Sequence, residues 1–292
     1  MGKLSSIFRR CMPANSASVA PSNNPESYVR NGRIPWSPGY SAFKDNFIRQ
    51  TLCDPALMKI FRTNSPLPRA FGMRLDERVV EYPWVLSRLP SAGRILDAGS
   101  TLNAPFLLDL PDLRDRPIII YTLAADYITL RPTVSYIFGD LRNTLLKDAV
   151  VEAIVCISTL EHIGFGPDFK RWSRTNPYPR TERQSYKLAL AEFRRLLKDD
   201  GRLLLTVPYG RQEDHGWLQQ FDLDGINEIK SAFGGDVTDE CYYRYSSEGW
   251  QQSTAEACKD AAYFNIHASR TFGPDYAAAA RAVTCIEFRK TS

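Results

Sequence analysis

The spacing of apolar residues changes along the chain and divides it into three regions. Residues 41–90 carry apolar side chains at helical spacing, first from Phe43 to Phe61 and then from Val79 to Leu86, so we expect two helices there. Residues 1–40 hold five of the prolines and show no sustained period, which predicts a flexible N-terminal tail or a partly ordered arm. From residue 91 onward the pattern changes to short apolar runs.

These short runs, each bounded by turn residues, predict buried parallel strands. They are Arg94–Asp97, Pro117–Leu123, Val134–Phe138, Ala153–Ser158 and Arg202–Val207. A helix is expected from Thr181 to Leu197 with its stop at Gly201, and the runs Ala262–Ile266 and Ala282–Phe288 are expected to add an antiparallel edge. The alternation predicts an α/β fold with a doubly wound, mostly parallel, seven-stranded sheet over residues 91–292, preceded by a helical cap over 41–90. Ligands bind such sheets at the carboxyl ends of the strands.

The composition supports a packed globular protein and narrows its partners. With 292 residues, 43% of them hydrophobic and 24% charged, the chain is neither disordered nor a small disulfide scaffold. The formal net charge is +4, and residues 1–40 carry five basic residues against one acidic residue, which accounts for all of it. A formally neutral body argues against a general nucleic-acid binder and favours a small-molecule or glycan-sized ligand. A homodimer remains open.

The six cysteines form no CxxC pair, so we interpret them as reduced thiols of a cytoplasmic protein. No stretch approaches the roughly 18 apolar residues of a membrane span, and the start of the chain lacks the apolar core of a signal peptide. Gly2 followed by Ser6 fits a loose acylation pattern, which we interpret as a chance match at a frayed start.

Polar residues follow three of the expected strands. Asp97 to Ser100 come after the first strand, Asp140 and Leu141 after the third, and Ser158 to His162 after the fourth. A glycine at such a turn lets backbone approach a ligand closely, and a carboxylate at a strand end can accept a hydrogen bond from an amine or a hydroxyl. The first turn taken alone fits an ordinary strand end with a helix N-cap equally well.

Taken together, these segments resemble the class I S-adenosylmethionine-dependent methyltransferases. The resemblance covers about residues 75–290 and rests on LDAGS (96–100), GDL (139–141), ISTLEHIG (157–164) and LLKDDGRLLLTVPYG (196–210). With DHGW (214–217) it is closest to the enzymes of sugar and cell-surface polysaccharide biosynthesis. It implies a Rossmann-like methyltransferase fold with S-adenosyl-L-methionine as cofactor. The implied contacts are Asp97, Ala98, Gly99 and Ser100 at the methionine end, Asp140 and Leu141 at the adenine, and Ser158, Thr159, Leu160 and His162 beside the sulfonium.

The chain departs from that family at two positions. The first turn has only Gly99, followed by Ser100-Thr101-Leu102-Asn103, so a tighter loop is expected with Asn103 as a polar contact. The acid that binds the ribose hydroxyls is also out of register, because Asp126 comes a few residues after the second strand.

Methyl transfer to a hydroxyl requires a base, and two of the three histidines fall near strand ends. We predict His215 as the base, oriented by Asp214 or Glu213, with Trp217 able to stack on a sugar face. His162 is the second catalytic candidate, although the cofactor wall suits it better. The predicted reaction is O-methylation of a sugar, glycan or related small-molecule hydroxyl.

Several alternatives stay open beside this prediction. Asp214, Asp222 and Asp224 offer carboxylate oxygens for Mg²⁺, an alternative that we do not favour because loop acids are usually solvated. The insert Phe165–Arg180 fits a lid or an exposed loop, and His267 fits a surface or sheet position. A non-catalytic scaffold of the same fold is the main alternative function. A nicotinamide-dependent oxidoreductase is less favoured, because no G-x-G-x-x-G follows the first strand.

Overall fold

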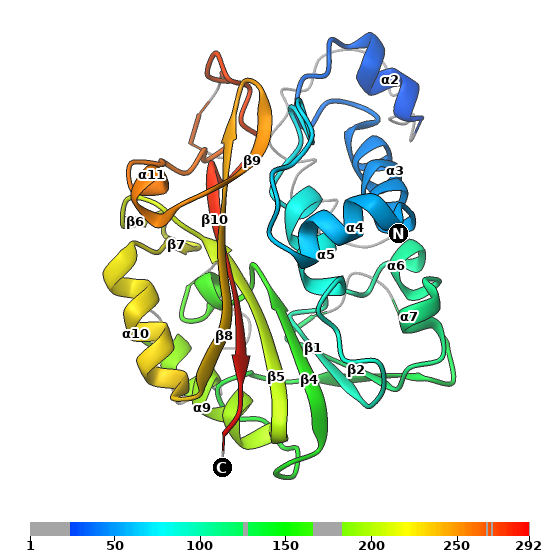
Figure 1. Cartoon of the computed structure of the whole chain (residues 1–292), viewed down its shortest axis with the longest axis vertical. Coiled ribbons are helices and arrows are strands. Elements are labelled where there is room, and N and C mark those ends of the chain that lie inside the picture. Colours follow the sequence, from blue (N-terminus) through cyan, green and yellow to red (C-terminus); the bar gives the residue numbers. More distant parts are fainter. Residues whose placement is uncertain (1–23, 125–127, 166–182, 267, 270, 292) are drawn as a thin grey trace.

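The structure is a computed structural model that describes residues 24–124, 128–165, 183–266, 268–269 and 271–291. Its centre is a sheet of eight strands in the order β3-β2-β1-β4-β5-β10-β8-β9 (Figure 1). The strands are β1 (Ile95–Ala98), β2 (Ile118–Thr122), β3 (Val134–Phe138), β4 (Val151–Ile157), β5 (Leu197–Pro208), β8 (Asp236–Ser246), β9 (Gly249–Ser253) and β10 (Ala282–Arg289). A separate pair is formed by β6 (Glu213–Asp214) and β7 (Gln219–Gln220).

Strand directions confirm the predicted fold class. The strands β3, β2, β1, β4 and β5 run parallel, and β10 lies antiparallel between β5 and β8. The sheet gains an eighth strand because β9 forms a hairpin with β8, pairing Ser246 with Gly249. The order of strands reverses between β1 and β4, which makes that junction the switch point of a doubly wound, Rossmann-like sheet.

Two apolar cores, one on each face, hold the sheet between layers of helices. Neighbouring residues of one strand alternate between them, so Ile95 belongs to one core and Leu96 to the other. The first core includes side chains of the N-terminal helices, and the second includes those of α9 and α10. Figure 1 shows these two groups of helices on opposite sides of the strands. Burial on both faces explains why the parallel strands read as nearly continuous apolar runs.

The helices are α2 (Pro25–Arg30), α3 (Tyr40–Cys53), α4 (Pro55–Arg62), α5 (Arg78–Leu86), α6 (Pro105–Leu108), α7 (Pro111–Arg114), η1 (Leu160–His162), α9 (Tyr186–Leu196), α10 (Leu223–Phe233) and α11 (Ala255–Cys258). The first predicted helix is divided into α3 and α4. Asp54 caps α4 by accepting hydrogen bonds from the backbone N–H groups of Ala56 and Leu57, and Pro55 occupies the first helical position.

Two local predictions are wrong. The helix α9 ends before Gly201, because Leu197 already passes into β5 and Asp200, at φ 63°, takes the left-handed turn. Ala262–Ile266 forms no strand, since the Tyr263 N–H donates to the Glu213 side chain and the Phe264 N–H to the Ala279 carbonyl. The strands that extend the antiparallel edge are instead β8 and β9.

Residues 24–40 form a packed arm. The Tyr28 side chain is fully buried, and its hydroxyl donates to the Arg74 carbonyl at 2.8 Å. The Trp36 indole donates to the Ala278 carbonyl at 2.8 Å. The acylation pattern and Cys11 lie outside the described residues, within which the other five cysteines are free thiols and no helix could span a membrane.

Candidate cofactor and acceptor site

The turns after β1 and β4 touch at the switch point. A Cβ placed on Gly99 would lie 2.2 Å from Thr159 Oγ1, so the close approach of the two turns requires glycine. Gly99 has φ 108°, and Ser100 (φ 68°) and Ser158 (φ 36°) also take left-handed conformations. The single glycine of the first turn is therefore placed against the end of β4, and the two turns that meet here hold four predicted cofactor residues: Gly99, Ser100, Ser158 and Thr159.

Asp97 fixes the conformation of the first turn by accepting hydrogen bonds from it. Its Oδ1 accepts hydrogen bonds from the Thr101 N–H at 3.0 Å and hydroxyl at 3.1 Å, and its Oδ2 accepts from the Leu102 N–H at 2.9 Å. Burial raises the pKa of Asp97 to about 7, against the lowering effect of these hydrogen bonds. Because Asp97 and Ala98 are fully buried, they support the turn from within the sheet.

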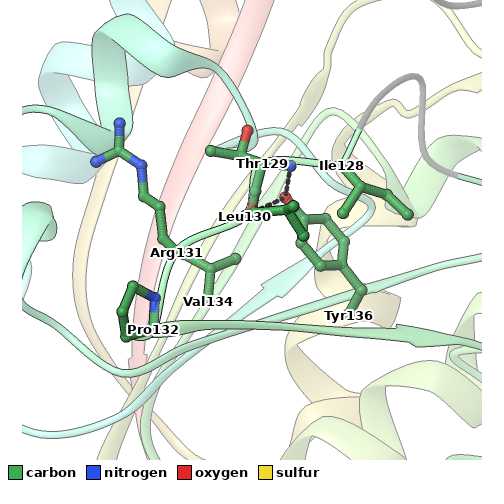
Figure 2. Close-up of a pocket in the computed structure, with 7 residues that line it drawn as sticks. All are labelled: Ile128, Thr129, Leu130, Arg131, Pro132, Val134 and Tyr136. Atoms are coloured by element: carbon green, nitrogen blue, oxygen red, sulfur yellow. Dashed lines mark hydrogen bonds between the residues drawn. The ribbon is translucent and has the colours of Figure 1, made fainter.

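Asn103 joins the first turn to the third strand. Its amide donates to Ser100 Oγ at 3.1 Å, and its Oδ1 accepts from the Tyr136 hydroxyl at 2.9 Å. That hydroxyl accepts in turn from the Thr129 N–H at 2.8 Å, as the dashed lines in Figure 2 show. Residues 128–132, Val134 and Tyr136 line a small cavity of about 340 Å³, which no sequence motif indicated. Asp126, the ribose candidate, lies outside the described residues.

Asp140 is held by an arginine. The Arg142 guanidinium donates to both carboxylate oxygens, at 3.0 Å from Nε to Oδ1 and 2.7 Å from Nη2 to Oδ2. The Arg142 N–H also donates to Oδ1 at 2.9 Å. Arg142 is buried, whereas 18% of the Asp140 side chain stays accessible, and Leu141 is 8% accessible. The predicted adenine pair is thus fixed in place at the end of β3.

A carboxylate from the helical cap ties β4 and β5 together. Glu81 of α5 is fully buried, and its Oε1 accepts from the hydroxyls of Ser158 at 2.5 Å and Thr206 at 2.7 Å. Its Oε2 pairs with Arg78, one turn earlier on the same helix. Sequence reasoning missed both residues, although acids inside the apolar run of α5 were the available signal.

His162 lies in η1, next to Trp217 in space. Its Nδ1 lies 2.9 Å from the Trp217 carbonyl, so we assign the proton to Nδ1 and the lone pair to Nε2. Burial lowers the pKa of His162 to about 4, yet 39% of its side chain is accessible. A neutral, partly accessible imidazole suits the wall of a ligand site.

His215 has a carboxylate beside it, but not the one its sequence neighbour offers. Its Nε2 lies 3.3 Å from Glu213 Oε2, and its Nδ1 lies 3.4 Å from the Asn265 amide nitrogen. Asp214 instead pairs with Arg183 at 3.0 Å and accepts from the Gly216 N–H. Of the two predicted orienting carboxylates, Glu213 lies beside the ring, but His215 Nε2 makes no hydrogen bond to it.

The remaining candidates do not gather into a metal site. Asp222 caps α10 by accepting from the Gly225 N–H at 2.9 Å, Asp224 is exposed, and Asp214 is paired with arginine. Among the described residues no three His, Cys, Asp or Glu side chains are grouped to hold a metal ion. Apart from Phe165, the predicted lid over Phe165–Arg180 lies outside the described residues, as does His267.

Comparisons with known proteins give similarities of fold only. No family model and no curated protein matches the sequence. The [4+2]-cyclase SpnF is 17% identical over 81% of this chain and 92% of its own, with a TM-score of 0.47. The 1,6-didemethyltoxoflavin-N1-methyltransferase of Burkholderia thailandensis, solved with S-adenosylhomocysteine, is 14% identical over 96% and 94%, with a TM-score of 0.42. At these identities and TM-scores the similarity says nothing about this chain's reaction, which depends on its own residues.

Proposed function

We propose that the chain transfers a methyl group from S-adenosylmethionine to a hydroxyl of a small molecule. The observation that carries the proposal is the meeting of the β1 and β4 turns at the switch point, where Gly99 contacts Thr159. An ordinary strand end would not need two left-handed residues and a glycine in van der Waals contact with the neighbouring turn. Ligands of doubly wound sheets bind at this position.

The residues present fit the cofactor. Asp140 offers a partly accessible carboxylate to an adenine amino group, and the Ser100 and Thr159 turns border the methionine end. When bound, the sulfonium supplies an activated methyl group with a neutral leaving group. The protein's task is then to align the acceptor and exclude water.

The proton of the acceptor hydroxyl goes to His215. The Asn265 amide nitrogen lies 3.4 Å from Nδ1, so we place the lone pair on Nδ1, which can accept that proton when the substrate displaces the amide. The Glu213 carboxylate, 3.3 Å from Nε2, stabilises the imidazolium that forms. Tyr263 packs on the other side of the ring at a centroid distance of 5.1 Å. A sugar or glycan hydroxyl, which the sequence resemblance favours, remains our proposal for the acceptor.

Thermal melting with S-adenosylhomocysteine, with NADH and without ligand tests this function. A ligand at 100 times its Kd stabilises the native state by about 2.7 kcal/mol, which raises Tm by roughly 5–10 °C. We expect that shift with S-adenosylhomocysteine alone. A shift with NADH alone would favour an oxidoreductase, and no shift with either would favour the scaffold.

A further inference from the structure

We propose that the acceptor carries a positively charged amino group, which is bound in a recess formed by Glu77, Glu161 and the Tyr263 ring. This inference rests on the proposed methyl transfer and specifies its substrate as an amino alcohol or an amino sugar. We call these three residues, with Glu81 and Arg78, the acidic recess.

The carboxylates of the recess come from two elements that meet over the ends of β4 and β5. Glu77 precedes α5 and Glu81 lies within it, while Glu161 lies in η1, and the three are 7%, 0% and 1% accessible. Glu81 is satisfied by Arg78 and two hydroxyls. Glu77 Oε2 accepts a hydrogen bond from the Ala280 N–H at 3.2 Å.

Glu161 lacks a partner for its outer oxygen. Its Oε2 is buried without a hydrogen bond among the residues that the structure describes, and its Oε1 lies 3.8 Å from His162 Nε2. Such an oxygen costs free energy unless a donor or cation reaches it. The partner that would satisfy it is therefore expected to come from a ligand.

The neighbouring basic residues do not neutralise the negative charge of ionised Glu77 and Glu161. Asp76 is paired with Lys44 at 2.5 Å and bonded to the Tyr40 hydroxyl, and Glu213 lies beside Arg211 and His215. Arg78 is a basic residue that acts electrostatically on both Glu77 and Glu161, and it is already paired with Glu81. Glu77 and Glu161 thus share Arg78 as a counter-charge, although Arg78 already pairs with Glu81.

Aromatic rings continue the recess toward the proposed base. The ring centroids of His162 and Trp217 are 5.3 Å apart, those of Trp217 and Tyr263 6.2 Å, and those of Tyr263 and His215 5.1 Å. Glu77 and Glu161 both act electrostatically on Tyr263. Carboxylates combined with ring faces are the groups that bind organic ammonium ions. Beside the buried carboxylates, 39% of the His162 side chain and 23% of the Arg78 side chain are accessible.

Protonation of the recess supports this assignment. Burial and the neighbouring acids raise the pKa of Glu77 to about 8 and that of Glu161 well above its usual range, with Arg78 opposing both shifts. A cation favours the ionised carboxylates, so its binding releases protons and its affinity rises with pH through about 8. The other titratable groups facing the recess are Glu81, His162, Tyr263, and His215 with Glu213.

The test compares ligands that differ mainly in charge. Choline and 3,3-dimethyl-1-butanol have the same shape, and glucosamine and glucose differ at one substituent. Calorimetry on protein saturated with S-adenosylhomocysteine should show, for at least one pair, the cation binding about tenfold or more tightly than its neutral partner. Glu161→Gln should abolish that preference and leave the Kd for S-adenosylhomocysteine within twofold. The control Glu248→Gln, at an exposed position, should keep it.

Equal binding within both pairs, or a charge preference that survives Glu161→Gln, would overturn the inference. The same titrations without nucleoside separate it from the proposed function. If the protein prefers the charged ligands but does not bind S-adenosylhomocysteine, the ammonium site is supported and methyl transfer is refuted. If it binds S-adenosylhomocysteine but shows no charge preference, methyl transfer is supported and the ammonium site is refuted.

Discussion

Replacing Gly99 by alanine tests the contact between the first and fourth turns. The new Cβ would lie 2.2 Å from Oγ1, 2.5 Å from Cγ2 and 2.9 Å from Cβ of Thr159. A φ of 108° adds a backbone penalty of about 1–2 kcal/mol for a side chain with a Cβ, and the forced repacking adds about 1–3 kcal/mol. We therefore expect Gly99→Ala to lower the free energy of unfolding by about 2–5 kcal/mol.

The matched control is Gly32→Ala. Gly32 also has a positive φ, of 68°, but a Cβ there would meet no atom within 4 Å. Urea denaturation of the control should show the backbone penalty alone, about 1–2 kcal/mol.

Thr159→Ala removes the two closest atoms of the neighbouring turn. In the double variant with Gly99→Ala it should therefore recover about 1–2 kcal/mol, as a double-mutant cycle would measure. Calorimetry should show that Gly99→Ala weakens S-adenosylhomocysteine binding, while Gly32→Ala does not. Equal destabilisation by the two glycine variants, with unchanged nucleoside affinity, would refute both the packing and the placement of the cofactor.

Three further predictions concern the polar groups. Glu81→Gln breaks the buried pair with Arg78 and should cost about 3–5 kcal/mol in urea denaturation. Glu256→Gln, which removes an exposed pair with Lys259, should leave the urea midpoint nearly unchanged. The pKa of Asp97 is about 7 in the folded protein and about 4 in the unfolded chain, so the stability that Asp97 contributes falls as pH rises between these values. Asp97→Asn should remove this contribution to the pH dependence of the free energy of unfolding. An unchanged pH dependence between pH 4 and 7 would contradict the assignment. His215→Ala should lower turnover on an identified acceptor roughly 10²- to 10⁴-fold without changing nucleoside affinity, and full activity would return the role of base to His162 or water.

The parallel half of the sheet could be predicted because β1, β2 and β4 are buried on both faces, and the edge strand β3, although only partly buried, still forms a short run bounded by turn residues. The runs that became β1, β2, β3 and β4 are found within one or two residues of their observed bounds. The strands β8 and β9 carried no such signal. Their residues alternate with charged and polar side chains such as Arg244 and Gln251, and β8 lies toward an edge where pairing with β10 decides the structure.

The candidate site was predictable where it depends on strand ends and missed where it depends on tertiary contacts. Gly99, Asp140 and Ser158 follow strands directly, so their positions follow from the fold. Glu81 reaches the site from a helix some 77 residues before Ser158, and Glu213 rather than Asp214 faces His215 because the β6–β7 turn sets the side-chain directions. No local pattern encodes either contact.

The hydrogen bonds of Glu81 join the helical cap to the sheet, so the cap and the sheet are not independently stable although the sequence pattern changes at residue 90. A fragment that begins at β1 would strip the Ser158 and Thr206 hydroxyls of their shared acceptor and uncover apolar side chains that α5 now shields. Such a fragment should not fold by itself. In the intact chain, the helical cap and the turns after β1 and β4 should unfold in one cooperative melting transition.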